Sequence, residues 1–208
     1  MRILGISGSV RRGSHNLTLL RAAEAHLPPT AELEAWRGIA DLPAYDENLD
    51  AAGTPVAVAA LRLAISRADA VIIATPEYNS SIPGALKNAL DWASRPWPEN
   101  SLRGKAVGVI GASTGLFGAV WAQAELRKVL TTIGANVIDR ELAVGQAQDA
   151  FDEHGRLEDP HLRHRLAEIV AALLEQATTS PQASAGPTGS LRSSPRDDWL
   201  PRVTRFMA

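Results

Sequence analysis

Residues 2–16, RILGISGSVRRGSHN, carry an apolar run that ends abruptly in a polar loop. Arg2–Ser7 is short and nearly continuous in its apolar character, which predicts a strand buried on both faces. The loop that follows combines two arginines with glycine, serine and asparagine. It therefore offers many hydrogen-bond donors and little side-chain bulk, which suits the binding of a small, strongly negative group.

The alternation of strand and helix continues along the chain. Strand patterns recur at Ala70–Thr75 and Ala106–Ala112, and weaker ones at Glu32–Trp36 and 136–144. Helical patterns follow each of them, with Ser14, Asn16 and Thr54 as cap candidates, at 17–25, 56–67, 83–94, 118–133 and 160–177. Five strands alternating with five helices predict an α/β fold. We expect a flavodoxin-like three-layer sandwich with a five-stranded parallel sheet in the order 2-1-3-4-5.

One domain over residues 1–177 accounts for this pattern. From Thr178 onward the sequence TTSPQASAGPTGSLRSSPRDD is poor in apolar residues and rich in serine, proline and glycine. Such a composition cannot pack a core, so we expect a disordered tail over 178–208.

Composition narrows the class of protein. The 21 basic and 23 acidic side chains give a net charge of −2, which provides no general attraction for nucleic acid or for a membrane surface. The absence of cysteine excludes disulfides, thiolate ligands and the cysteine-dependent phosphatases. No apolar stretch is long enough to span a bilayer. We expect a cytoplasmic protein without nucleic-acid or membrane partners.

The first loop differs from two well-known phosphate binders. In a P-loop, lysine and serine or threonine stand where this chain has Ser14 and His15, and GISGSVRRG lacks the Gly-x-Gly-x-x-Gly spacing of dinucleotide folds. What remains is a loop of hydroxyls and arginine before a helix N-terminus, a receptor for a terminal monophosphate. The donors we expect are Ser9, Arg11, Ser14 and Asn16. The alternative is that Ser14 or Asn16 only caps the first helix and that both arginines are solvated.

A second polar loop follows the third strand in TPEYNSSIPGALKNALDW, residues 75–92. Pro76 and Pro83 bound a short, rigid loop. Within it Tyr78 offers a flat apolar wall, and Asn79 and Ser80 offer hydrogen-bonding groups, a combination that suits a planar heterocycle. An ordinary turn with a half-buried tyrosine is the alternative. In the third loop, ASTGLFG at 112–118, Ser113 is the candidate contact.

Together, GSVRRGSHN, PEYNSSIPGALKNALDW and GASTGLFG resemble the NADPH-dependent FMN reductase family, which includes chromate, quinone and azo-dye reductases. The resemblance covers residues 2–177. It implies bound FMN, NAD(P)H as co-substrate, and a homodimer or homotetramer. It places the phosphate among Ser9, Arg11, Ser14, His15 and Asn16. It places the ring along Pro76, Glu77, Tyr78, Asn79 and Ser80, with Ser113 at the other edge. The chain departs from the family at Trp121, where similar proteins often have arginine.

The implied activity is that of an oxidoreductase that passes hydride from NAD(P)H through FMN to a quinone, azo compound, flavin or oxidised metal. No catalytic acid–base residue and no metal site are expected. Two alternatives are an FMN-binding electron-transfer module without substantial NAD(P)H activity and a flavin-free sensor of phosphorylated metabolites. A wide apolar stripe at the helix that starts at Pro83 is a candidate surface for a second subunit, and burial within one chain is the alternative. The stripe is formed by Ile82, Ala85, Leu86, Ala89, Leu90 and Trp92.

Overall fold

The computed structural model describes residues 1–179. The tail expected over 178–208 therefore lies outside the described residues, except for its first two positions. Thr178 and Thr179 continue the last helix, α6 (Pro160–Thr179), two residues beyond the predicted end.

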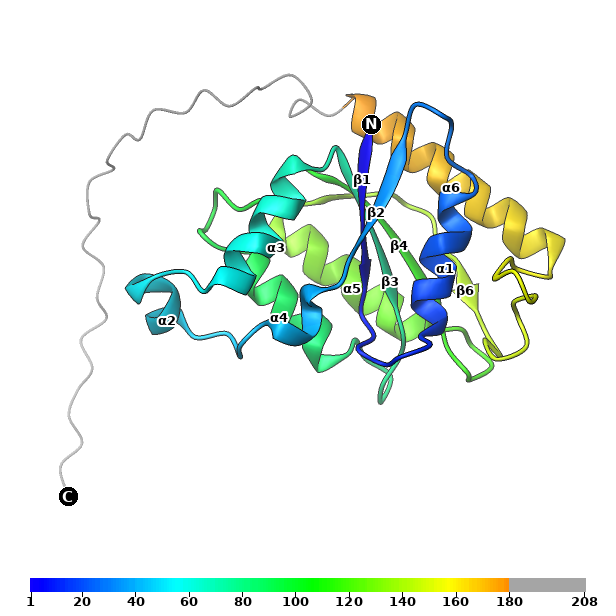
Figure 1. Ribbon diagram of the computed structural model, residues 1–208, viewed down its shortest axis with the longest axis horizontal. Helices are drawn as coiled ribbons and strands as arrows, with labels where there is room; N and C mark the ends of the chain where they lie inside the picture. Colours follow the sequence, from blue (N-terminus) through cyan, green and yellow to red (C-terminus); the bar gives the residue numbers. More distant parts are fainter. Residues whose placement is uncertain (180–208) are drawn as a thin grey trace.

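Four of the five predicted strands of the central sheet have the predicted bounds. Its strands β1 (Arg2–Ser7), β2 (Glu32–Trp36), β3 (Ala70–Thr75) and β4 (Ala106–Ala112) have the predicted bounds. All pairs are parallel, and the order β2-β1-β3-β4-β5 confirms the flavodoxin-like topology (Figure 1). Every residue of β3 and β4 is buried, because helices cover both faces of the sheet.

The predicted fifth strand over 136–144 is wrong in one respect, because it is broken into two. Both β5 (Asn136–Val137) and β6 (Ala143–Val144) pair with β4, the first at the start of β4 and the second at its end. Between them the guanidinium of Arg127, on helix α5 (Val120–Ile133), donates hydrogen bonds to the carbonyls of Ile138 and Arg140. The arginine thus supplies hydrogen bonds to two carbonyl groups in the segment between the two short strands.

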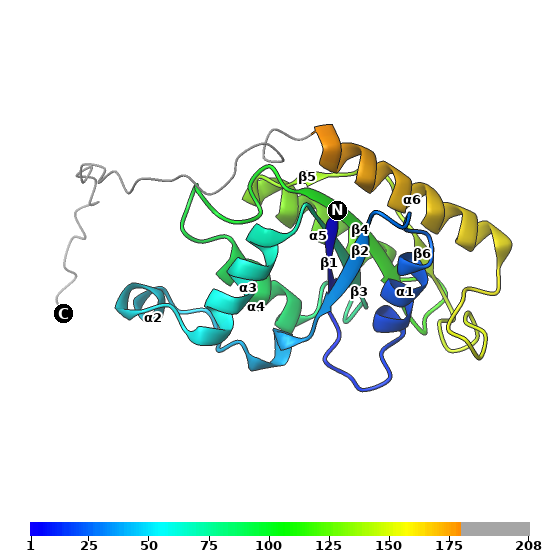
Figure 2. The same ribbon diagram turned by 45° about the horizontal axis from the view of Figure 1, so that its top comes forward.

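Two helical layers enclose the sheet, as Figures 1 and 2 show. Helices α1 (His15–Glu24) and α6 lie on one face, and α3 (Val56–Arg67), α4 (Gly84–Ala93) and α5 lie on the other. Because side chains alternate along a strand, Val71 and Ile73 of β3 pack with the second layer and Ile72 packs with the first.

The helix ends differ from the prediction where the backbone forbids continuation. Helix α5 begins at Val120 rather than at 118, because Gly118 and Ala119 have φ of 60° and 63°. Thr54 does not cap α3, whose N-cap is Pro55; the threonine hydroxyl donates to Asp50 instead. Helices α1 and α4 shift by one or two residues at each end, whereas α3 has the predicted bounds.

Two short elements between β2 and α3 were not predicted, a 3-10 turn η1 (Gly38–Asp41) and a helix α2 (Glu47–Ala52). The carboxylate of Asp46 caps α2 by accepting from the N–H groups of Asn48 and Leu49. Helix α2 buries no residue, so it has no apolar periodicity by which to recognise it.

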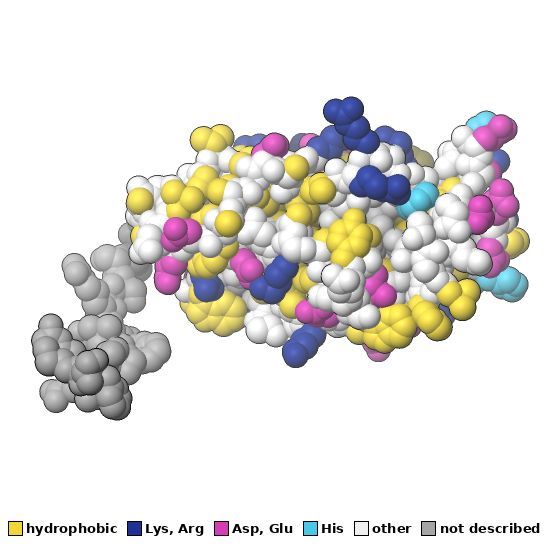
Figure 3. All heavy atoms as spheres, turned by 90° about the horizontal axis from the view of Figure 1, so that it is seen from below, with side chains coloured by type: hydrophobic (Ala, Val, Ile, Leu, Met, Phe, Trp, Pro, Cys, Tyr) yellow, Lys and Arg dark blue, Asp and Glu magenta, His cyan; other side chains and the backbone are white. Residues whose placement is uncertain are grey.

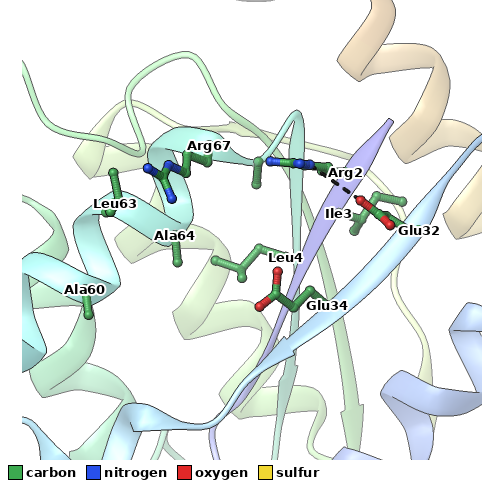
Figure 4. A pocket seen from close by; sticks show the side chains of 10 residues that line it. Arg2, Ile3, Leu4, Glu32, Glu34, Ala60, Leu63, Ala64 and Arg67 are labelled. Atoms are coloured by element: carbon green, nitrogen blue, oxygen red, sulfur yellow. Dashed lines mark ion pairs between the residues drawn. The ribbon is translucent and has the colours of Figure 1, made fainter.

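A hollow of about 260 Å³ lies between the edge strand β2 and α3 (Figure 4). Three charged side chains from β1 and β2 line this hollow. Arg2 and Glu32 form an ion pair, with 3.4 Å between Nε and Oε1, and Glu34 lines the hollow as well. Such charges discourage an edge strand from pairing with another chain. The hollow does not include the loops at the carboxyl ends of the strands, where the fold places its ligand.

Candidate functional site

The loops after β1, β3 and β4 meet at one edge of the sheet. The N–H of Gly8 donates to the carbonyl of Ala74 at 2.8 Å, so the first loop leaves β1 beside the end of β3. The side chain of Asn16 joins the start of α1 to Ala112 at the end of β4. Figure 3 looks onto this edge and shows Lys and Arg side chains next to exposed hydrophobic ones. The juxtaposition of loops expected from the fold is therefore present.

The first loop ends in an unpaired donor. Ser14 is the N-cap of α1 and is 4% exposed, yet its hydroxyl bonds no backbone N–H and has no partner among the described residues. The N–H groups of His15 and Asn16, in the first turn of α1, also lack helical acceptors. A buried hydroxyl beside free N–H groups at a positive helix end fits a phosphate.

Arginine supplies the charge of this loop. Arg11 is exposed, and one terminal nitrogen donates to the carbonyl of Gly13 at 3.3 Å. Burial and the nearby Arg11 guanidinium lower the pKa of His15 below its usual value, so its imidazole is neutral at pH 7 and adds no positive charge. A cavity of about 440 Å³ extends from Ser9 and Arg11 towards Trp36 at the end of β2.

The side chain of Asn16 is bonded within the fold. It is 2% exposed. Its amide nitrogen donates to the carbonyl of Ala112 at 2.8 Å, and its amide oxygen accepts from the N–H of Ala112 at 2.9 Å. The side chain therefore holds α1 against β4 from a buried position, and the backbone N–H of Asn16, in the first turn of α1, remains available to a ligand.

The second loop forms a two-residue hairpin. Tyr78 and Ser81 exchange backbone hydrogen bonds of 3.0 and 3.1 Å. Between them Asn79 and Ser80 have φ of 54° and 59°, the left-handed pair of a type I′ turn. Serine rarely adopts this conformation, and such strain concentrates at functional sites. Tyr78 is 52% exposed at the tip, whereas Pro76 is buried at the base.

Side chains fasten the hairpin to α5. The carboxylate of Glu77 accepts from the N–H groups of Trp121 and Ala122 at 3.0 and 3.1 Å, in the first turn of that helix. The hydroxyl of Ser81 donates to Glu125 at 2.5 Å. Glu77 was expected along the ring, but Ser81 and Glu125 were not found from the sequence. Contacts between residues 44 apart leave no local pattern.

The third loop packs tightly against β6. A Cβ placed on Gly118 would lie 2.5 Å from the carbonyl carbon of Ala143. Ser113 is half-buried and accepts from the N–H of Gly115 at 3.2 Å. Beside it, Phe117 and Trp121 are exposed and meet edge to face at 5.2 Å. We call the exposed side chains of Tyr78, Leu116, Phe117 and Trp121 the aromatic patch.

The fold and these loops define a flavodoxin-like protein with an arginine-bearing loop at a helix N-terminus and a two-residue hairpin at the same edge of the sheet. The chain belongs to the NADPH-dependent FMN reductase family, whose family model matches residues 1–149. The resemblance inferred from the sequence is thus confirmed.

Similar proteins include an FMN reductase, a quinone reductase and a flavoenzyme of known structure. An NAD(P)H-dependent FMN reductase of Pseudomonas aeruginosa is 43% identical over 174 residues, which cover 83% of this chain and 93% of that protein. A quinone reductase of Escherichia coli is 39% identical over 154 residues, or 73% of this chain and 81% of that protein. The structure of FerB, a flavoenzyme NAD(P)H:(acceptor) oxidoreductase from Paracoccus denitrificans, has a TM-score of 0.76 at 34% identity. The match covers 86% of this chain and 98% of that one.

Proposed function

We propose that this chain is an NAD(P)H-dependent oxidoreductase that binds FMN and reduces small-molecule acceptors, quinones foremost. The observation that carries the proposal is the buried, unpaired hydroxyl of Ser14 in the arginine-bearing loop at a helix N-terminus. It agrees with the family, whose model describes FMN reductases, and with the names of the quinone-reducing relatives.

The residues of the three loops divide the task of holding the cofactor. Ser9, Arg11, Ser14 and the N–H groups of His15 and Asn16 would hold the phosphate. Tyr78, with Pro76 and Glu77 at the base of the hairpin, would line the ring, and Ser113 would lie at its other edge. The chemistry that FMN supplies when bound is hydride transfer between NAD(P)H and an oxidised acceptor. Donors at Asn79 and Ser80 would stabilise negative charge that develops on the reduced ring.

Arg11→Ala tests the phosphate assignment. The dissociation constant for FMN, measured by quenching of flavin fluorescence, should rise roughly tenfold to a hundredfold, because a charge-assisted hydrogen bond is lost. Arg67→Ala removes another exposed charge, from the far end of α3, and should leave the constant unchanged. If Arg11→Ala binds FMN as tightly as the parent protein, the assignment of Arg11 is wrong.

Steady-state oxidation of NAD(P)H with a quinone separates the enzyme from the alternatives. The FMN-loaded protein should oxidise NAD(P)H well above the rate of free FMN. An electron-transfer module would show only that background rate. A flavin-free sensor would remain colourless after FMN is added and excess cofactor is removed.

We also propose that a second copy of the chain covers the aromatic patch. The stripe expected to serve this purpose is unsuitable, because Leu86, Ala89, Leu90 and Trp92 are already buried within the chain. The side chains of the aromatic patch are exposed, two of their rings are in contact, and the N–H of Trp121 is bonded to Glu77 of the hairpin. A homodimer or homotetramer should therefore be found by light scattering, and a molar mass of one chain would contradict this.

Within the part of the chain that the structure describes, no helix has the length and apolar character needed to cross a bilayer. We propose a cytoplasmic enzyme, because its electron donor NAD(P)H is a cytoplasmic nucleotide. Fractionation of cells that express the full chain tests this, and recovery of the activity outside the cytoplasmic fraction would contradict it.

A further inference from the structure

A second cleft lies at the end of the sheet opposite to the three loops. It has a volume of about 600 Å³ and lies between the last turns of α3 and the segment that connects α4 to β4. Figure 1 shows this connecting segment in green at the upper left, far from the loops at the bottom. Of the side chains that line the cleft, Glu99 is the one acidic group. Four are cationic, namely Arg62, Arg95, Arg103 and Lys105. We call this the basic cleft.

One of the four cations is neutralised. The guanidinium of Arg62 makes two hydrogen bonds to the carboxylate of Asp50, at 3.0 and 2.9 Å, and its Nε donates to the carbonyl of Trp92. Arg62 therefore forms part of the wall and has little capacity left for a ligand.

The other three cations form no ion pair within the described residues and bond only neutral oxygens. The Nε of Arg95 donates to the hydroxyl of Tyr45 at 3.0 Å, and the Nε of Arg103 donates to the carbonyl of Pro98 at 2.6 Å. Both guanidinium groups lie over aromatic rings, at 5.7 and 5.5 Å from the centroids. The rings position the two groups and leave their terminal nitrogens free.

Two of the polar groups that line the cleft are buried, and one of them has no hydrogen-bond partner among the described residues. The hydroxyl of Ser101 is buried and has no hydrogen-bond partner among the described residues, which costs free energy unless a ligand supplies one. Lys105 is 8% exposed, and its ammonium donates to the carbonyl of Ala68 at 2.5 Å. Burial lowers the pKa of Lys105 below its usual value, and the carboxylate of Asp69 partly offsets this.

We propose that the basic cleft binds the phosphate group of a small molecule, separately from the FMN site. Arginine forks match the geometry of phosphate oxygens, and two of them line this cleft together with Lys105 and the unpartnered hydroxyl of Ser101. The volume lies in the usual range for small-molecule sites. Because the cleft and the loops stand at opposite ends of the sheet, both sites can be filled at once.

Calorimetric titration of the FMN-loaded full chain tests the proposal, with inorganic phosphate and glycerol 3-phosphate as probes and sulfate at equal ionic strength as the reference. We expect saturable binding of phosphate that Arg103→Gln weakens about tenfold. Arg67→Gln is the matched control, because Arg67 is on α3 but lines the hollow beside β2 and not the basic cleft. It should leave the affinity unchanged. Tighter binding of glycerol 3-phosphate identifies a phosphate ester as the ligand, and equal binding identifies free phosphate.

Ser101→Ala gives an independent measurement. It should weaken phosphate binding about threefold without lowering the stability of the ligand-free protein, because the hydroxyl it removes has no partner there. Three results would overturn the proposal: no saturable binding, sulfate binding as tight as that of phosphate, or an equal loss of affinity in Arg67→Gln. The visible spectrum of bound FMN, recorded on the same samples, reports the other site separately.

Discussion

Replacing Gly118 with alanine should lower the free energy of unfolding by about 3 kcal/mol and disrupt the loop expected to contact the flavin ring. Gly118 has φ of 60°, a conformation that costs a residue with a side chain about 1 kcal/mol or more. Its new Cβ would also lie 2.5 Å from the backbone carbon of Ala143 and 2.6 Å from the nitrogen of Val144. Both are backbone atoms, so β6 would have to move away from the third loop.

Gly115→Ala is the matched control for this experiment. Gly115 is in the same loop, but a Cβ there would meet only the hydroxyl of Ser113, at 3.6 Å. Its stability, measured by urea unfolding of the FMN-free protein, should stay within about 0.5 kcal/mol of the parent. If the two variants unfold at the same urea concentration, the close packing of the third loop against β6 has no energetic importance.

The strands at the centre of the sheet could be predicted because their signal is local. A strand buried on both faces has an uninterrupted apolar run, and β3 and β4 each have one that ends where the polar loop begins. Their carboxyl ends then lie at one edge of the sheet, so the meeting of the loops followed from topology. This is why the position of the site was predicted more fully than its contacts.

What escaped prediction depends on side chains that reach across the fold. The break between β5 and β6 occurs where Arg127 supplies donors to two carbonyls, although the sequence there reads as one strand. The cap of α5 comes from Glu77, in a different loop. Such a carboxylate stabilises a helix end as a local cap would, but only the folded chain brings it there.

Asn16→Ala is the second substitution with a large expected effect, and it decides what Asn16 does. The sequence suggested a phosphate donor, whereas the structure shows its amide bonded to both the N–H and the carbonyl of Ala112. Truncation would leave both buried backbone groups unpaired, at a cost of about 1–3 kcal/mol each. We therefore expect FMN-free protein to lose about 3 kcal/mol in urea unfolding.

Asn48→Ala is the control, because Asn48 is exposed on α2, and it should unfold like the parent protein. Asn16→Asp refines the test at nearly constant shape. The introduced carboxylate can still accept from the N–H of Ala112 but cannot donate to its carbonyl, so this variant should also be destabilised at neutral pH. If Asn16 acted only on the phosphate, Asn16→Ala would weaken FMN binding and leave the urea midpoint of the FMN-free protein unchanged. A large loss of stability in the FMN-free protein instead means that the bonds of Asn16 to β4 hold the start of α1, next to the first loop, in place.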